Sequence, residues 1–205
     1  MEKSICCFID ILGYKDIICN SSDEENEKNI EKLRGMYSYF ENLNNGHIDE
    51  YRNYKVRTFS DNIYIEVQLK EDRIFPLGVC NEGNIANILR ELSHFQNMMF
   101  VEWGFFVRGA IVYGEVYSDN NIIYGKGIIE AVEGEKKAKF PRIIISEELK
   151  KIIDENNLCF FNTKISEDLY FNMLFFSYAE KIDVISYVGY NWVQDKLSES
   201  HNNWK

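Results

Sequence analysis

The sequence predicts an α+β fold of the ferredoxin-like sandwich type, in which helices pack on one face of a mostly antiparallel sheet. Strand-like and helix-like segments alternate in the order strand, helix, strand, strand, helix, strand, helix, strand. A hydrophobic fraction of 45% is ample for a packed core, and only two prolines interrupt the 205 residues. This length fits one domain that spans residues 1–205.

Short apolar runs, several with alternating polarity, predict the strands. They cover residues 4–10, 54–59, 63–69, 105–113, 115–117 and 142–145. The triplet Ser60-Asp61-Asn62 is expected to form a tight hairpin turn between the second and third of these runs. Gly114 is expected to interrupt the strand in which it lies.

Apolar residues at helical spacing predict four longer helices. They cover residues 22–43, 84–99, 128–139 and 147–156. Ser22 or Asp23 is expected to cap the first of them, and Ser146 the last. Gly134 is expected to break the third helix, and Pro141 stops the chain from continuing it.

The C-terminal segment 158–205 is rich in aromatic residues and is treated as an extension of the same domain. A core or subunit interface is the favoured use of these rings, and a stacking platform for bases is the alternative. The net charge of −10 argues against binding to a nucleic-acid backbone. No apolar run is long enough to cross a membrane, so a cytoplasmic protein is expected.

Two aspartates are placed where catalysis would need them. Asp10 ends the first strand, and residues 11–14 lead into a helix whose backbone N–H groups could bind phosphate. Asp61 lies at the tip of the hairpin formed by the next two strands. If those strands flank the first, both carboxylates meet at one end of the sheet and could share two Mg²⁺ or Mn²⁺ ions. Taken singly, each is also a common helix-entry or turn residue.

Three motifs in register resemble the class III nucleotide cyclases. They are residues 8–14 (FIDILGY), 55–61 (KVRTFSD) and 108–116 (RGAIVYGEV). The resemblance implies a cyclase catalytic domain with two metal ions per site, held by Asp10, Asp61 and the backbone carbonyl of Ile11. It also implies that the segment after the first strand binds the substrate, through Leu12, Gly13, Tyr14 and Lys15. For Lys15, a solvated first-turn lysine is an equal alternative.

Within that superfamily, the chain is most similar to the pyrimidine cyclases of the Pycsar antiphage systems. The similarity lies in residues 8–13, 60–61, 107–109 and 124–143. Adenylyl and guanylyl cyclases carry an Asn and an Arg that steady the transition state, where this chain has Ile129 and Glu133. A carboxylate cannot replace that Arg beside a developing negative charge. The candidate replacement cations are Arg108, Lys136, Lys137, Lys139 and Arg142.

The acidic residues of that segment have a second interpretation. Glu133 and Glu135 precede Lys137 and Lys139 by four residues, so the helix is equally well explained as a solvated face with ion pairs.

Arg57 stands where purine cyclases read the base, and its guanidinium offers only donors. Cytosine and uracil both present acceptors to such a group. The second purine-reading position holds Ile122, which cannot accept a hydrogen bond from adenine. Both departures favour a pyrimidine, with UTP preferred to CTP on the resemblance alone. The alternative is that Arg57 pairs with a surface acid on an edge strand.

The resemblance therefore implies a homodimeric enzyme that converts UTP or CTP to the 3′,5′-cyclic nucleotide and pyrophosphate. The product would signal to a separate effector in antiphage defence. The alternatives are a catalytically dead, nucleotide-binding regulatory module, a purine cyclase, and a ferredoxin-like interaction domain without a ligand.

Overall fold

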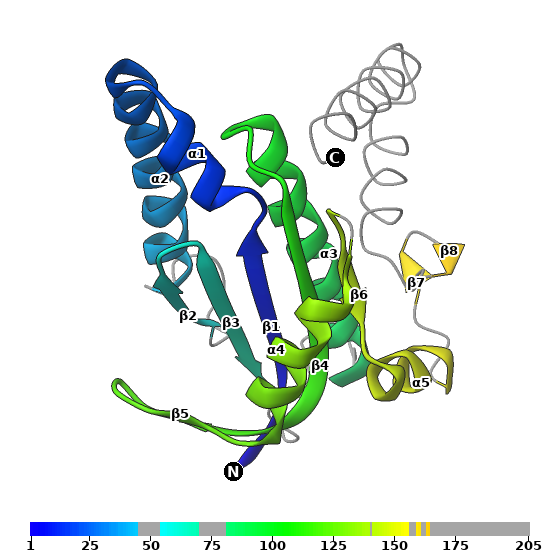
Figure 1. The fold of residues 1–205 in the computed structure, drawn as a ribbon. Helices are drawn as coiled ribbons and strands as arrows, with labels where there is room; N and C mark the ends of the chain where they lie inside the picture. Colours follow the sequence, from blue (N-terminus) through cyan, green and yellow to red (C-terminus); the bar gives the residue numbers. More distant parts are fainter. Residues whose placement is uncertain (45–53, 70–80, 140, 156–158, 161–162, 165–205) are drawn as a thin grey trace.

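The computed structural model describes residues 1–44, 54–69, 81–139, 141–155, 159–160 and 163–164. A central sheet is flanked by helices on both faces (Figure 1). Most of the aromatic C-terminal segment, 158–205, lies outside the described residues, so its predicted use stays a prediction. Within the described part of the chain, no helix is long and apolar enough to cross a membrane.

The main sheet has the order β2-β3-β1-β4, and β5 and β6 both pair with β4. Its strands are β1 (Glu2–Ile11), β2 (Tyr54–Phe59), β3 (Asn62–Gln68), β4 (Val107–Ser118), β5 (Ile123–Tyr124) and β6 (Ile143–Ile145). All pairs are antiparallel except β4 with β6. A separate pair, β7 (Cys159–Phe160) and β8 (Thr163–Lys164), follows later in the chain. The predicted α+β fold with a mostly antiparallel sheet is confirmed.

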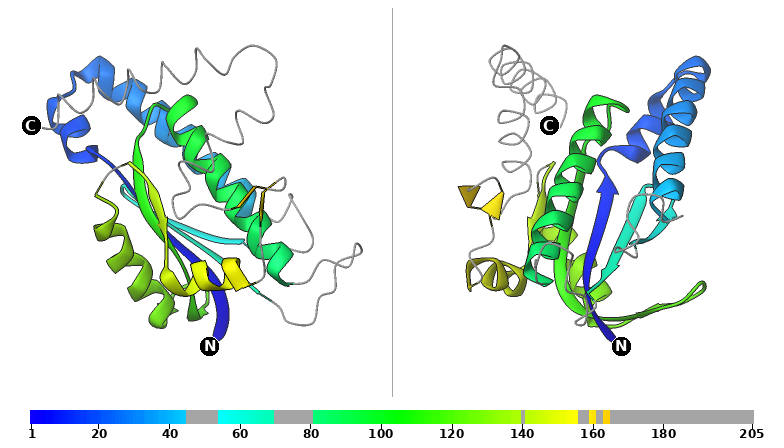
Figure 2. Two further views of the ribbon diagram at one scale, coloured as in Figure 1. Left: turned by 90° about the vertical axis from the view of Figure 1, so that its right-hand side faces the viewer. Right: turned by 180° about the vertical axis from the view of Figure 1, so that it is seen from behind.

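The helices are α1 (Tyr14–Asn20), α2 (Asp23–Asn44), α3 (Asn81–Val101), α4 (Lys126–Lys137) and α5 (Glu147–Glu155). The prediction that all helices cover one face is wrong, because α4 lies on the face opposite α2 and α3 (Figure 2). Both predicted caps are confirmed. The backbone N–H of Glu25 donates to Ser22 Oγ at 3.4 Å, and that of Leu149 donates to Ser146 Oγ at 3.3 Å.

The alternation of β1 explains why it must be covered on both faces. Ile5, Cys7, Ile9 and Ile11 point into the larger hydrophobic cluster, which includes side chains of α2, α3 and α5. Cys6 points the other way, into a smaller cluster that includes Ala131 of α4. Both faces of β1 are therefore covered, and its unbroken apolar run is consistent with this central position.

Two glycines that were expected to interrupt elements lie inside continuous ones. β4 runs through Gly114, and a Cβ at this position would lie 2.8 Å from the Cα of Gly127 in α4. α4 likewise runs through Gly134, where a Cβ would lie 2.5 Å from the Cβ of Ala110. These glycines let helix and sheet approach closely, and they do not mark breaks in the backbone.

Candidate metal and nucleotide site

The site begins at the C-terminal end of β1, where three polar residues stand side by side. Asp10 is paired in register with Asn62 of β3 on one side and with Arg108 of β4 on the other. Residues that pair directly across antiparallel strands project their side chains to the same face. This face is the one that α4 covers, because the neighbouring even-numbered residues of β1 pack toward that helix.

The two turns that carry the aspartates are joined through the backbone. The N–H of Ile11 donates to the carbonyl oxygen of Asp61 at 3.0 Å. The tip of the hairpin holds Ser60 at a φ of 56°, and Tyr37 of α2 donates its hydroxyl to the Ser60 carbonyl at 2.5 Å. Asp61 is half-buried and accepts a hydrogen bond from the Asn62 amide at 3.1 Å. The predicted convergence of the Asp10 and Asp61 turns at one end of the sheet is therefore what the structure has.

The chain leaves β1 through a turn that starts α1. Leu12 is buried and donates its N–H to the Phe106 carbonyl at 2.8 Å. Gly13 has a φ of 74°, a left-handed conformation in which glycine carries no steric penalty. Tyr14 then begins the helix and packs against the larger hydrophobic cluster, whereas Lys15 is exposed. The expected helix entry after Asp10 is confirmed.

The Asp10 carboxylate shares Arg108 with a second carboxylate. Arg108 Nε donates to Asp10 Oδ2 at 3.2 Å, and Arg108 Nη2 lies 3.1 Å from the same oxygen. Glu135 of α4 places Oε1 2.5 Å from Arg108 Nε, in an ion pair that is not aligned as a hydrogen bond. The pKa of Asp10 is raised to about 6 in all. Burial is the largest cause, the charge of Arg108 opposes it, and the charges of Asp61 and Glu135 add to it.

Asp10 and Asp61 suit a hard divalent cation. Carboxylate oxygens are the ligands that Mg²⁺ and Mn²⁺ prefer. The negative charge of Asp61 is felt at Asp10, where it raises the pKa, and a cation between two such groups would relieve that repulsion. Within the described residues, no group of three or more His, Cys, Asp or Glu side chains is placed to hold a metal. Two carboxylates alone would leave several positions for water and substrate oxygens.

Arg57 lies on β2, half-buried, and is paired in register with Tyr64 of β3. The pKa of Asp119 is lowered mainly by hydrogen bonds from the backbone N–H groups of Asn121 and Ile122 and from the Tyr117 hydroxyl, and the charge of Arg57 lowers it further. Asp119 belongs to the loop between β4 and β5, so this loop and β2 lie near each other.

A second link holds the same two elements together. Lys55 of β2 donates to the carbonyl and hydroxyl oxygens of Ser118, at 3.0 and 2.8 Å. Its Nζ also lies 3.8 Å from the fully buried Glu66 carboxylate. The strand that carries Arg57 is thereby anchored to the end of β4.

Of the candidate cations, Arg108 is the one whose contact with Asp10 the structure shows. Lys136 and Lys137 are exposed at the C-terminal end of α4, and Lys139 is exposed just beyond it. Arg142 precedes β6, and its carbonyl accepts the Gly109 N–H at 3.0 Å.

Glu135 was the residue whose role the sequence interpretation missed. Its expected surface pair with Lys139 is wrong, because Glu135 is 5% exposed and α4 ends at Lys137. One feature of the sequence could have indicated that Glu135 is buried. It follows the small residues Gly127 and Ala131 at four-residue intervals, so all three lie on one face of α4, and all three are buried.

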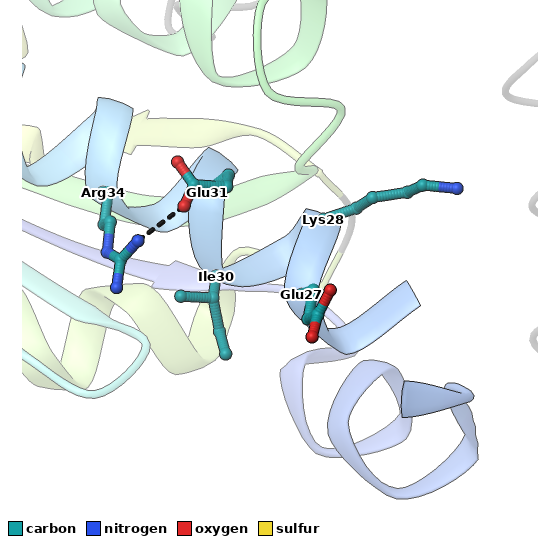
Figure 3. Close-up of a pocket in the computed structure, with 5 residues that line it drawn as sticks. All are labelled: Glu27, Lys28, Ile30, Glu31 and Arg34. Carbon is teal, nitrogen blue, oxygen red and sulfur yellow. Dashed lines mark hydrogen bonds and ion pairs between the residues drawn. The ribbon is translucent and has the colours of Figure 1, made fainter. Parts of the chain in front are cut away.

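A pocket elsewhere on the molecule involves only α2. Its lining comprises Glu27, Lys28, Ile30, Glu31 and Arg34 (Figure 3). These side chains point outward from one exposed helix, and Arg34 pairs with Glu31 at 2.5 Å. The pocket takes no residue from β1, β3 or β4, so it is separate from the aspartate site.

Solved structures of cyclase domains share this architecture. The guanylyl cyclase domain of the RhoGC fusion protein from the fungus Blastocladiella emersonii, described as a non-canonical dimer, matches with a TM-score of 0.53 at 17% identity. That match covers 76% of this chain and 85% of the other. The catalytic core of a rhodopsin-guanylyl cyclase with converted specificity, in complex with ATPαS, gives a TM-score of 0.55 at 16% identity and covers 74% and 81%.

A third match is the guanylate cyclase domain of RhGC from Catenaria anguillulae in complex with GTP. Its TM-score is 0.50 at 17% identity, with coverage of 74% of this chain and 82% of the other. No family model and no curated protein match the sequence. At these identities the likeness concerns the fold. The chain has the fold of a class III nucleotide cyclase catalytic domain.

Proposed function

We propose that this protein is a nucleotide cyclase that uses Asp10 and Asp61 to hold the divalent cations of the reaction. The observation that carries the proposal is the meeting of the two aspartates at one end of the sheet, on a cyclase fold, with their turns joined by the 3.0 Å hydrogen bond from Ile11 to Asp61. Bound Mg²⁺ or Mn²⁺ would neutralise the triphosphate and lower the pKa of the ribose 3′-hydroxyl.

The reaction has a simple balance. The 3′-oxygen forms a bond to the α-phosphorus, and the bond between that phosphorus and the oxygen bridging to the β-phosphate breaks. Pyrophosphate leaves with the electron pair of the broken bond, and the hydroxyl proton passes to water. Arg108 is the cation best supported as a partner for the phosphates, because it already lies in the site and keeps a third of its side chain exposed.

The proposed substrate is a pyrimidine nucleotide, UTP or CTP. Arg57 supports this choice because it offers only hydrogen-bond donors, and Ile122 supports it because it cannot accept from an adenine amino group. The two pyrimidines are left as alternatives, with UTP favoured by the Pycsar resemblance. That resemblance also underlies the proposed role in antiphage signalling through a separate effector.

We also propose a homodimer, since the resemblance implies sites shared between two subunits. Large apolar side chains that are exposed among the described residues support it. Ile129 on α4, Ile122 beside β5 and Tyr124 within it are all exposed. An interface of about 1,600 Å² in total would be expected for a specific complex of this kind.

A second candidate function is a catalytically dead module that binds nucleotide and regulates a partner. Ile129 and Glu133 favour it, because they stand where active purine cyclases have Asn and Arg.

One experiment separates these functions. Purified full-length protein is incubated with Mn²⁺ and each of the four ribonucleoside triphosphates, and cyclic products are quantified by chromatography and mass spectrometry. Cyclic UMP or cyclic CMP as the main product supports the proposal, and preferential turnover of ATP or GTP contradicts the pyrimidine assignment. Nucleotide binding without any cyclic product would establish the regulatory module instead. Asp10→Ala and Asp61→Ala serve as the inactive controls.

A further inference from the structure

Glu135 is a carboxylate in an unusual place for a charged residue. It is 5% exposed and follows Gly127 and Ala131 at four-residue intervals on the face of α4 that meets the sheet. A buried carboxylate is strongly destabilising unless a positive partner compensates its lost hydration. Such a residue therefore points to a specific partner.

That partner is Arg108, whose guanidinium lies between two carboxylates. Its Nε is 2.5 Å from Glu135 Oε1, and the same nitrogen donates to Asp10 Oδ2 at 3.2 Å. A guanidinium is planar, holds its charge at every working pH and can contact two anions at once. Arg108 is thus the shared cationic partner of the Glu135 and Asp10 carboxylates.

The backbone fixes Glu135 against this guanidinium. The preceding residue, Gly134, lies so close to the sheet that a Cβ would be 2.5 Å from the Cβ of Ala110. Ala110 is two residues after Arg108 on β4 and faces the same side. The contact between α4 and β4 therefore sets the position of Glu135, and this position does not depend on Asp10.

We propose that Glu135 is a positioning residue that keeps the Arg108 guanidinium in the site when the Asp10 carboxylate binds a divalent cation. The inference rests on the proposed function, in which Asp10 is a metal ligand. A cation that binds Asp10 must compete with Arg108 for the Oδ2 oxygen. The Glu135 carboxylate is then the partner that Arg108 keeps. The Arg108 N–H groups therefore stay where a triphosphate would bind.

The first test is made on metal-free, full-length protein and needs no turnover. Asp10→Asn mimics the withdrawal of the Asp10 charge, and the Nε–H resonance of Arg108 is followed by nitrogen-15 NMR. The resonance is expected to stay resolved and slow to exchange in Asp10→Asn, and to disappear into rapid exchange in Asp10→Asn/Glu135→Gln. The matched control Asp10→Asn/Glu133→Gln, which removes an exposed carboxylate of the same helix, should keep it. Persistence of the resonance in the Glu135→Gln double variant overturns the proposal.

The second test measures Mn²⁺ binding by calorimetry without nucleotide. Glu135→Gln leaves Arg108 to Asp10 alone, so Mn²⁺ affinity should fall about tenfold, as expected when one charged contact is redistributed. In an Arg108→Met background the same change should alter affinity by less than about twofold, because Glu135 acts through Arg108. Equal losses in both backgrounds would mean a simple effect of charge at a distance, and would overturn the positioning role.

The two proposals fail in distinguishable ways. If no triphosphate is cyclised or Mn²⁺ does not bind, the proposed function falls, while the Arg108 resonance still decides the role of Glu135. If cyclisation occurs and the Arg108 resonance is unchanged by Glu135→Gln in the Asp10→Asn background, only the positioning role is refuted. Well-dispersed NMR spectra of each variant confirm that the protein has folded.

Discussion

Asp10→Asn should stabilise the metal-free protein at neutral pH. The pKa of Asp10 is raised from 3.8 to about 6, first by burial and then by the charges of Asp61 and Glu135. Between these two values the folded protein holds a proton that the unfolded chain has lost. Folding therefore becomes less favourable as pH rises through this window, and a neutral amide removes the penalty.

The size of the effect follows from the shift. Two pKa units would correspond to about 3 kcal/mol if the group were fully withdrawn from water. Because the Asp10 side chain is 17% exposed, solvent screens part of its charge, and we expect about 1 kcal/mol. The gain should be complete above pH 6 and vanish below about pH 4.

Urea unfolding followed by circular dichroism, in EDTA and at several pH values between 4 and 7.5, measures this difference. Asp119→Asn is the opposite control. The backbone N–H groups of Asn121 and Ile122 lower the pKa of Asp119, so its ionised form favours folding and the substitution should destabilise at neutral pH. Excess Mn²⁺ should stabilise the wild type and leave Asp10→Asn unchanged. An Asp10→Asn variant that is less stable than wild type at pH 7.5 without metal would refute the reasoning.

Further expectations concern activity, packing and assembly. Asp61→Ala should reduce cyclisation at least about a thousandfold with an unchanged circular dichroism spectrum, and near-native turnover would exclude it as a metal ligand. Arg57→Ala should lower kcat/KM for the pyrimidine substrate roughly ten- to a hundredfold, measured with UTP and CTP in parallel; equal losses with ATP would contradict base recognition. Gly134→Ala should cost about 1–3 kcal/mol in urea unfolding and be partly rescued by Ala110→Gly, since the two Cβ atoms would lie 2.5 Å apart. Light scattering should show a dimer, and a monomer at active concentrations would contradict shared sites.

Local sequence patterns were sufficient for most of the elements and for the convergence of the turns that carry Asp10 and Asp61. The apolar run of β1, the helical spacing of α2 and the turn at Ser60 are properties of neighbouring residues, so sequence alone predicts them. The convergence of Asp10 and Asp61 could be predicted once the hairpin of β2 and β3 was placed beside β1. The structure has β3 paired with β1.

Packing between segments that are distant in the chain could not be predicted from the sequence. Local sequence suggests a break at Gly114, yet β4 continues through it, and the glycine is needed there because Gly127 of α4 approaches so closely. Glu135 has the local pattern of a surface ion pair, yet it is buried because α4 covers the second face of the sheet. In both cases the deciding contact lies across elements, and no periodicity within one element encodes it.

The register of β1 has a consequence for how reliably the chain can make its site. Asp10, Asn62 and Arg108 share one cross-strand row, while Ile9 and Ile11 point to the opposite, fully buried face. A slip of one residue would put isoleucines in contact with Glu135 and drive the Asp10 carboxylate into the main hydrophobic cluster. Misregistered chains would therefore lack the proposed site and be unstable, so cellular proteolysis would remove the same molecules in which the site is not formed.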